Sequence, residues 1–113
     1  MIKQLMSKDI RNYLKSDSKK ILLDVRTENE WTSCGKPDGE KLGLKTYFLT
    51  IKDENFLKEF KDLLINKDHE ILTMCKVGQR SQFVSQLLEN DNYICVNISD
   101  GFDGWKSFDL PCL

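Results

Sequence analysis

Short apolar runs alternate along the chain with segments in which apolar residues recur at helical spacing. We predict strands at residues 2–6, 21–25, 46–51, 70–74 and 93–98. Helices are predicted at 8–15, in one turn at 28–31, at 55–65, after residue 80, and at 102–108. This alternation predicts an α/β fold, with a central, mainly parallel sheet of about five strands and helices on both faces.

Helix ends and apolar faces follow from the same pattern. Ser7 is placed to cap the helix over 8–15, and Ser81 the helix after residue 80. Residues 32–45 hold three glycines and one proline without periodicity, which predicts a long loop. The later helices should each bury one apolar face, formed by Phe56, Leu57, Phe60, Leu63 and Leu64 in the first and by Phe83, Val84, Leu87 and Leu88 in the second.

A cysteine follows the predicted buried strand at 70–74. Cys75 begins a six-residue loop that ends at Arg80 and leads into a helix. Such a loop points several backbone N–H groups at one spot, and the helix dipole adds partial positive charge there. Lys76 and Arg80 add formal charge, and Gly78 can adopt the positive φ that a tight anion-holding loop requires. All of these favour the nucleophilic thiolate, whereas the alternative is an inert cysteine at a strand end.

This loop resembles the active-site loop of rhodanese domains, C-R/K-x-G-x-R-S. The segment LDVR at 23–26 resembles the family's D-V-R element, and GFDGW at 101–105 resembles its closing segment. At 35–39 the chain has GKPDG where many members have a G-H-I-P-G-A-like run. The resemblance spans the chain and implies one rhodanese-like domain over 1–113, a catalytic Cys75, and a substrate-binding loop of Lys76, Val77, Gly78, Gln79, Arg80 and Ser81.

Two polar residues at the end of the strand over 21–25 need partners. Asp24 lies within an apolar run, where a carboxylate requires hydrogen bonds or a paired base. The resemblance implies the same, and we interpret Asp24 and Arg26 as scaffold for the site. Because parallel strands end at one edge, Asp24, Cys75 and the turn at 99–101 should converge there.

Two other cysteine chemistries fit the sequence less well. His69 is the only histidine, and the strand over 70–74 at about 3.3 Å per residue would put it roughly 20 Å from Cys75, too far for a Cys–His dyad. Cysteine phosphatases have five residues between Cys and Arg, whereas four separate Cys75 from Arg80. The smaller ring of amides suits a single sulfur atom better than a phosphoryl group.

We therefore hypothesise a sulfurtransferase that moves sulfane sulfur from thiosulfate or a persulfide donor to a thiophilic acceptor through a Cys75 persulfide. Two alternatives remain open: a noncatalytic rhodanese-like binding module and a protein-to-protein sulfur carrier. Expected partners are a small sulfur-containing substrate or a persulfide-bearing protein, whereas the oligomeric state is undetermined. A resolving thiol that reacts with Cys75 is one role considered for Cys34. Cys95 should lie in the core, and Cys112 should be exposed.

The amino-acid composition limits the partners, location and cofactors that we expect. The 17 basic and 18 acidic residues give a net charge of −1, so neither nucleic acid nor a membrane is an expected partner. The chain has no apolar run near 18 residues and no signal-like start, so we expect a cytoplasmic location. The single histidine and four irregularly spaced cysteines indicate neither a metal site nor a disulfide framework, and we expect no cofactor.

Overall fold

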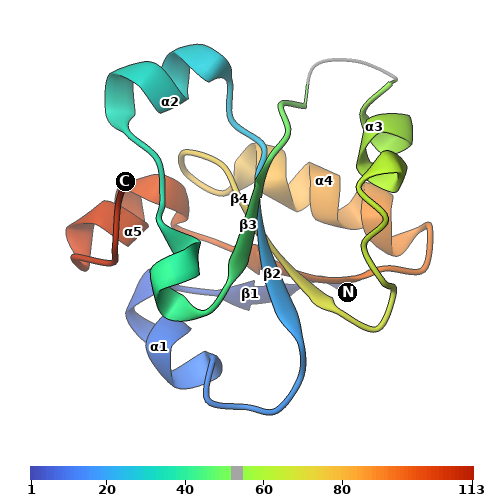
Figure 1. The fold of residues 1–113 in the computed structure, drawn as a ribbon, viewed down its shortest axis with the longest axis horizontal. Coiled ribbons are helices and arrows are strands. Elements are labelled where there is room, and N and C mark those ends of the chain that lie inside the picture. Colours follow the sequence, from blue (N-terminus) through green and yellow to red (C-terminus); the bar gives the residue numbers. More distant parts are fainter. Residues whose placement is uncertain (52–54) are drawn as a thin grey trace.

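The computed structural model describes residues 1–51 and 55–113, which form a five-stranded sheet. Its strands are β1 (Lys3–Leu5), β2 (Lys20–Asp24), β3 (Lys45–Phe48), β4 (Glu70–Met74) and β5 (Ile94–Ile98). They lie side by side in the order β1-β5-β4-β2-β3, and every pairing is parallel. The predicted α/β fold with a five-stranded parallel sheet is confirmed (Figure 1).

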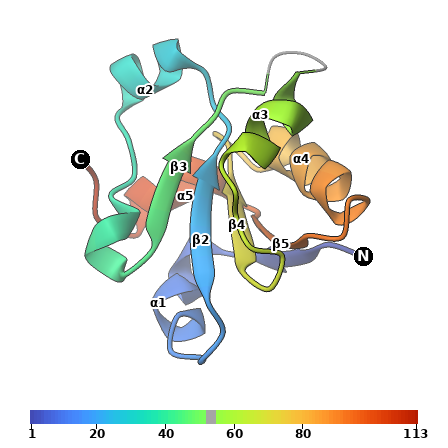
Figure 2. The ribbon, with the colours of Figure 1, turned by 45° about the vertical axis from the view of Figure 1, so that its right-hand side comes forward.

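Helices cover both faces of the sheet, as right-handed crossovers require. Figures 1 and 2 show α3 (Phe56–Asp62) and α4 (Gln79–Glu89) on one face, with α1 (Ile10–Tyr13) and α5 (Gly101–Ser107) on the other. The remaining helix, α2 (Glu28–Cys34), follows the carboxyl end of β2, and two 3-10 turns lie at η1 (Ser7–Asp9) and η2 (Gly39–Leu42). Within the two described ranges, no helix is long and apolar enough to cross a bilayer.

The core consists of two apolar layers separated by the sheet. Side chains of β2 and β4 alternate between them: Leu23 and Ile71 pack with α3 and α4, whereas Leu22 and Leu72 pack toward Trp105 of α5. Because both faces are covered, the central strands are buried on both sides. This explains why they read as continuous apolar runs rather than as alternating patterns.

The predicted helix over 8–15 is wrong in its start and its cap. A 3-10 turn at Ser7–Asp9 precedes a four-residue α1, and the Ser7 hydroxyl caps neither. Instead, the Ser7 backbone N–H and hydroxyl donate to Oδ1 of Asp100, at 3.0 and 2.9 Å. Ser7 therefore ties the end of β1 to the segment before α5, a long-range contact that its local sequence does not indicate.

The predicted loop over 32–45 is also wrong in part. The helix α2 continues through Cys34 because Thr27 and Glu30 form a capping box at its start, and η2 occupies 39–42. The segment between them is held by the chain's end: Pro37 bridges Cys112, and the Asp38 N–H donates to the Pro111 carbonyl oxygen at 2.8 Å. The absence of periodicity there reflects long-range pairing rather than a free loop.

Two apolar residues expected in the core lie at the surface. The helix α3 ends at Asp62, and Leu64 has a φ of +57° and is 87% exposed. Phe83 on α4 is 62% exposed, whereas Val84 and Leu88 are buried as predicted. The predicted strand over 46–51 is shorter as well, because β3 ends at Phe48.

Candidate active site

Cys75 lies directly after β4, at the carboxyl edge of the sheet and at the bottom of a short loop. The residue is 1% exposed, and the Gly78 N–H donates to its Sγ at 3.1 Å. Gly78 has a φ of +99°, as predicted, and is the N-cap of α4. The loop therefore spans only 75–78, since Gln79 and Arg80 already belong to the helix.

Ser81 lies inside the first turn of α4 and is not the predicted cap. Its hydroxyl lies 2.6 Å from Oδ1 of Asn97 and 3.4 Å from Sγ of Cys75. Asn97 lies on β5, where its Nδ2 donates to the Gly78 carbonyl oxygen at 3.1 Å and to Oε1 of Gln4 at 2.9 Å. Asn97 thereby fixes both the loop and the hydroxyl beside the thiol.

The environment of Cys75 favours its thiolate. Burial opposes ionisation, but hydrogen bonds from the Ser81 side chain and from the Ser81, Gly78 and Val77 amides outweigh it and lower the pKa of Cys75 below its ordinary value. By contrast, burial raises the pKa of Cys95 to about 12. Of these two buried thiols, the one after β4 is thus prepared for nucleophilic chemistry.

The start of α5 supports the loop from the side opposite its amides. The N–H groups of Phe102 and Asp103 donate to the carbonyl oxygens of Cys75 and Lys76, at 2.8 and 3.1 Å. Gly101 makes this approach possible, because a Cβ there would overlap both carbonyl oxygens. With its carbonyls held by α5, the loop can turn its N–H groups toward the sulfur.

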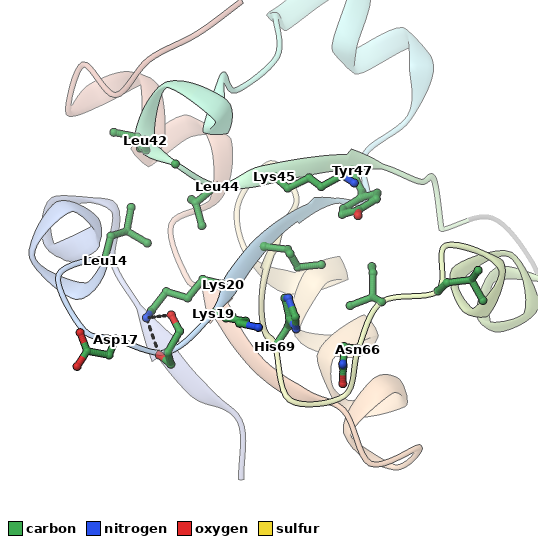
Figure 3. Close-up of a pocket in the computed structure, with 15 residues that line it drawn as sticks. Leu14, Asp17, Lys19, Lys20, Leu42, Leu44, Lys45, Tyr47, Asn66 and His69 are labelled. Carbon is green, nitrogen blue, oxygen red and sulfur yellow. Dashed lines mark hydrogen bonds between the residues drawn. The ribbon is translucent and has the colours of Figure 1, made fainter.

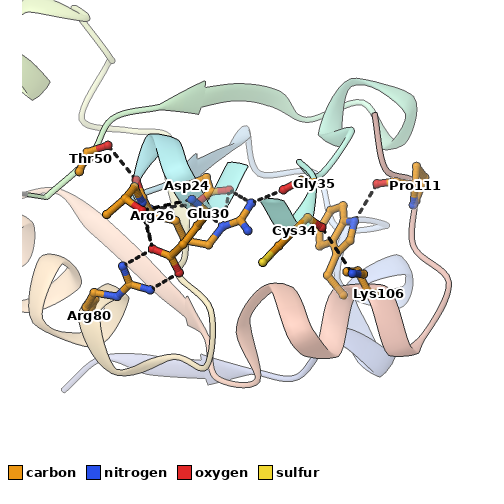
Figure 4. A network of polar contacts seen from close by, with 11 residues as sticks. Asp24, Arg26, Glu30, Cys34, Gly35, Thr50, Arg80, Lys106 and Pro111 are labelled. Carbon is orange, nitrogen blue, oxygen red and sulfur yellow. Dashed lines mark hydrogen bonds and ion pairs between the residues drawn. The ribbon is translucent and has the colours of Figure 1, made fainter. Parts of the chain in front are cut away.

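Each cation of the loop is paired with a carboxylate from another element. Lys76 Nζ lies 2.9 Å from Oδ2 of Asp103 on α5. Arg80 forms a two-pronged pair with Glu30 on α2, with N–O distances of 2.6 and 2.7 Å (Figure 4). The Arg80 hydrogen bond holds the pKa of Glu30 at about 2.

Asp24 and Arg26 form a buried ion pair beneath this contact. Arg26 donates from Nε and Nη2 to the Asp24 carboxylate, at 2.8 Å for the shortest bond, and from Nη2 to the Gly35 carbonyl oxygen at 2.9 Å. Its guanidinium also stacks over the Phe102 ring, 4.1 Å from the centroid. We expected Asp24 either to bond neighbouring amides or to pair with a base, and it does both, because the Arg26 backbone N–H also donates to its Oδ1 at 3.0 Å. These contacts connect β2, α2 and α5.

Comparison with known proteins identifies the family of this chain. The profile of the rhodanese-like domain matches residues 7–108. The chain belongs to the rhodanese-like domain family. Uncharacterized protein RP600 of Rickettsia prowazekii (strain Madrid E) is 32% identical to it over 120 residues, which cover 98% of this chain and 97% of that protein.

Solved structures agree on the fold of this rhodanese-like domain. Rv0390 from M. tuberculosis superimposes with a TM-score of 0.79 and 24% identity, covering 97% of this chain and 96% of that one. A rhodanese-related protein from Thermoplasma volcanium gives 0.76 and 18%, covering 98% and 97%. At such identities the likeness concerns the fold alone.

His69 lies far from the site, at the other end of β4. It lines a groove of about 560 Å³ beside the starts of β2 and β3, together with Lys20, Lys45 and Tyr47 (Figure 3). The His69 ring bonds the neighbouring Asp68 at 2.8 Å. The expectation that Cys75 forms no dyad with this histidine is thus in accord with the structure, which puts the length of β4 between them.

All four cysteines are free thiols. Cys95 is buried in the core and Cys112 is exposed, as predicted. Cys34 is partly buried at the end of α2, where Lys106 Nζ contacts its carbonyl oxygen at 3.4 Å (Figure 4). Within residues 1–51 and 55–113, no group of three or more His, Cys, Asp or Glu side chains could hold a metal ion.

Three residues that contact the site were not predicted from the sequence. Glu30 had a usable signal, because Thr27 and Glu30 have the spacing of a capping box, but nothing local indicated its pairing with Arg80. Asp103 and Asn97 had no signal of their own. Each reaches the loop from an element distant in sequence, so only the packed fold reveals its contact.

Proposed function

We propose that this rhodanese-like domain is a sulfurtransferase that carries sulfane sulfur on Cys75. The proposal depends on the position of the Cys75 sulfur at the start of α4, where the Gly78 N–H donates to it at 3.1 Å. Hydrogen bonds there lower the pKa of Cys75. The same amides would hold the outer sulfur of a Cys75 persulfide. We place this chemistry in the cytoplasm and in a single domain over 1–113.

The reaction has two half-reactions that each balance. The Cys75 thiolate attacks the outer sulfur of a donor R–S–SH, the donor S–S bond breaks, and R–S⁻ leaves while Cys75 becomes Cys–S–SH. With thiosulfate, sulfite leaves instead and the product is Cys–S–S⁻. A thiophilic acceptor, cyanide or a thiolate, then attacks the outer sulfur and releases the Cys75 thiolate. Because the thiol is covered, the donor must present its sulfur as a single terminal atom.

A phosphatase reaction receives less support from the same geometry. Phosphate chemistry needs a cation that is free to hold the phosphoryl oxygens. Arg80 is the cation at the relevant place, and both of its terminal nitrogens already bind Glu30. The segment between Cys75 and Arg80 is also one residue shorter than its counterpart in the phosphatases, so its smaller ring of amides suits one sulfur atom better than a phosphoryl group.

Steady-state kinetics test the proposal. With a sulfane donor and cyanide, the protein should form thiocyanate, and double-reciprocal plots at several donor concentrations should be parallel, as two half-reactions require. Cys75→Ser should abolish turnover, whereas Cys95→Ser, which changes the other buried cysteine, should retain it. Turnover that survives Cys75→Ser would contradict the mechanism, and no thiocyanate from any donor would favour the binding module.

A further inference from the structure

The charges around Cys75 determine which donors can approach it. Among the side chains of 76–80, which follow Cys75 in the loop and the start of α4, Lys76 and Arg80 are the cations, while Val77 and Gln79 are exposed and uncharged. Thiosulfate carries two negative charges, whereas an alkyl persulfide carries at most one. A site that uses thiosulfate well should therefore present cations whose charge is not already compensated.

Neither loop cation meets that condition. Asp103 opposes Lys76 at 2.9 Å, and the Lys76 pKa is raised by this hydrogen bond. Glu30 opposes Arg80 through two bonds. Lys106, the next cation along α5, contacts the Cys34 carbonyl oxygen, and Figure 4 shows it on the far side of Cys34 from Arg80.

The two acidic residues reach their cations through different supporting contacts. The Asp103 N–H donates to the Lys76 carbonyl oxygen at 3.1 Å, so the two residues are joined by backbone as well as by charge. Glu30 accepts from the Thr27 N–H and hydroxyl in the capping box, each at 3.1 Å. The Glu30 carboxylate is thus oriented by the capping box before it meets Arg80, whereas the Asp103 side chain is brought to Lys76 by the backbone bond between the two residues.

We infer that this site takes its sulfur from a neutral or monoanionic persulfide in preference to dianionic thiosulfate. The inference rests on the proposed sulfur transfer and specifies its donor. The amides of the loop suit the outer sulfur of either donor. Thiosulfate, however, brings a sulfonate group that finds two cations already occupied by carboxylates and is repelled by Glu30 and Asp103.

The test compares two donors, thiosulfate and the persulfide of 2-hydroxyethanethiol, with cyanide as acceptor. The wild type should show a kcat/KM for the persulfide at least about tenfold above that for thiosulfate. Asp103→Asn, which releases Lys76, should raise kcat/KM for thiosulfate about threefold to tenfold and leave the persulfide value within about twofold. Adding Lys76→Met to that variant should cancel the gain, and so should high salt.

The matched control is Asp17→Asn, which removes the same charge from an exposed residue beside the groove at the opposite edge of the sheet. This control variant should leave kcat/KM unchanged for both donors. Equal use of both donors by the wild type, or an unchanged donor ratio in Asp103→Asn, would overturn the inference and leave sulfur transfer standing. If neither donor produced thiocyanate, the proposed function would fail, and the inference with it.

Discussion

Gly78 faces the carbonyl group of Ser99 so closely that a Cβ at position 78 would overlap the Ser99 oxygen. The contact joins the loop after β4 to the segment after β5. It adds to the positive φ of Gly78, so two separate physical reasons require glycine at this position. The shape of the loop around Cys75 therefore depends on the neighbouring strand as well as on its own residues.

Gly78→Ala should disrupt the site. Overlap with Ser99 and the positive φ should together lower the free energy of unfolding by about 2–3 kcal/mol and reduce kcat/KM at least about tenfold. Gly43→Ala is the control, because Gly43 has a φ of +81° but open space around its α-carbon. It should cost only about 1 kcal/mol and leave activity unchanged. Full activity in Gly78→Ala would remove the argument for this loop shape.

Ser81→Ala should make the Cys75 thiolate form at higher pH. Loss of the hydroxyl that contacts Sγ at 3.4 Å should raise the pKa of Cys75, because a hydrogen bond that favours the thiolate is removed. The measurement is the rate of iodoacetamide labelling of the Cys75 peptide against pH. Ser85→Ala, which removes a buried hydroxyl bonded to Thr73 at 2.6 Å, should leave that profile unchanged. Superimposable profiles for wild type and Ser81→Ala would refute the role of the hydroxyl.

The sequence predicted the centre of the site because its information is local. The apolar run of β4, the cysteine after it and the helix after Gly78 lie within one continuous stretch, and β4 spans Glu70–Met74 as predicted. The D-V-R element was predictable for a similar reason, since a carboxylate in an apolar strand must find a partner nearby. Asp24 and Arg26 are two positions apart and bond each other.

The rest could not be read from sequence because it depends on which surfaces meet. Periodicity assigned Leu64 and Phe83 to the core, yet an apolar face can be wider than the surface that covers it, and both are exposed. Glu30 lies 50 positions before Arg80, and Asp103 lies 27 after Lys76. Pairs this distant along the chain compete with many equivalent pairings, so charge pattern alone does not select them.

Glu30→Gln should destabilise the protein in a pH-dependent way. The variant loses the pair with Arg80 and weakens the capping box, which should lower the free energy of unfolding near pH 7 by about 1–2 kcal/mol. Since the pKa of Glu30 is lowered from 4.5 to about 2, its contribution is present above pH 4.5 and is lost as pH falls toward 2. Urea titrations of wild type and variant should therefore converge in acid. The control is Glu28→Gln, which changes an exposed residue of the same turn and should have little effect on stability. A difference in the free energy of unfolding between wild type and Glu30→Gln that persists at low pH would contradict this role of Glu30.

Asp24→Asn should be among the most destabilising single changes at the site. It leaves the buried guanidinium of Arg26 without its counter-charge, which should cost about 3–5 kcal/mol. Thermal and urea unfolding measure the loss. Lys61→Ala breaks the Lys61–Asp91 surface pair and should cost less than about 1 kcal/mol. Equal losses in the two variants would mean that the Asp24–Arg26 pair does not brace the structure.

The most direct test of sulfur transfer is the intact mass of the protein after incubation with a persulfide donor. We predict a gain of about 32 Da, one sulfur atom, that cyanide reverses and that Cys75→Ser does not show. Peptide mapping should locate the added sulfur on Cys75 and not on Cys34, Cys95 or Cys112. An unmodified wild type, or an equal gain in Cys75→Ser, would contradict the claim that Cys75 carries the sulfur.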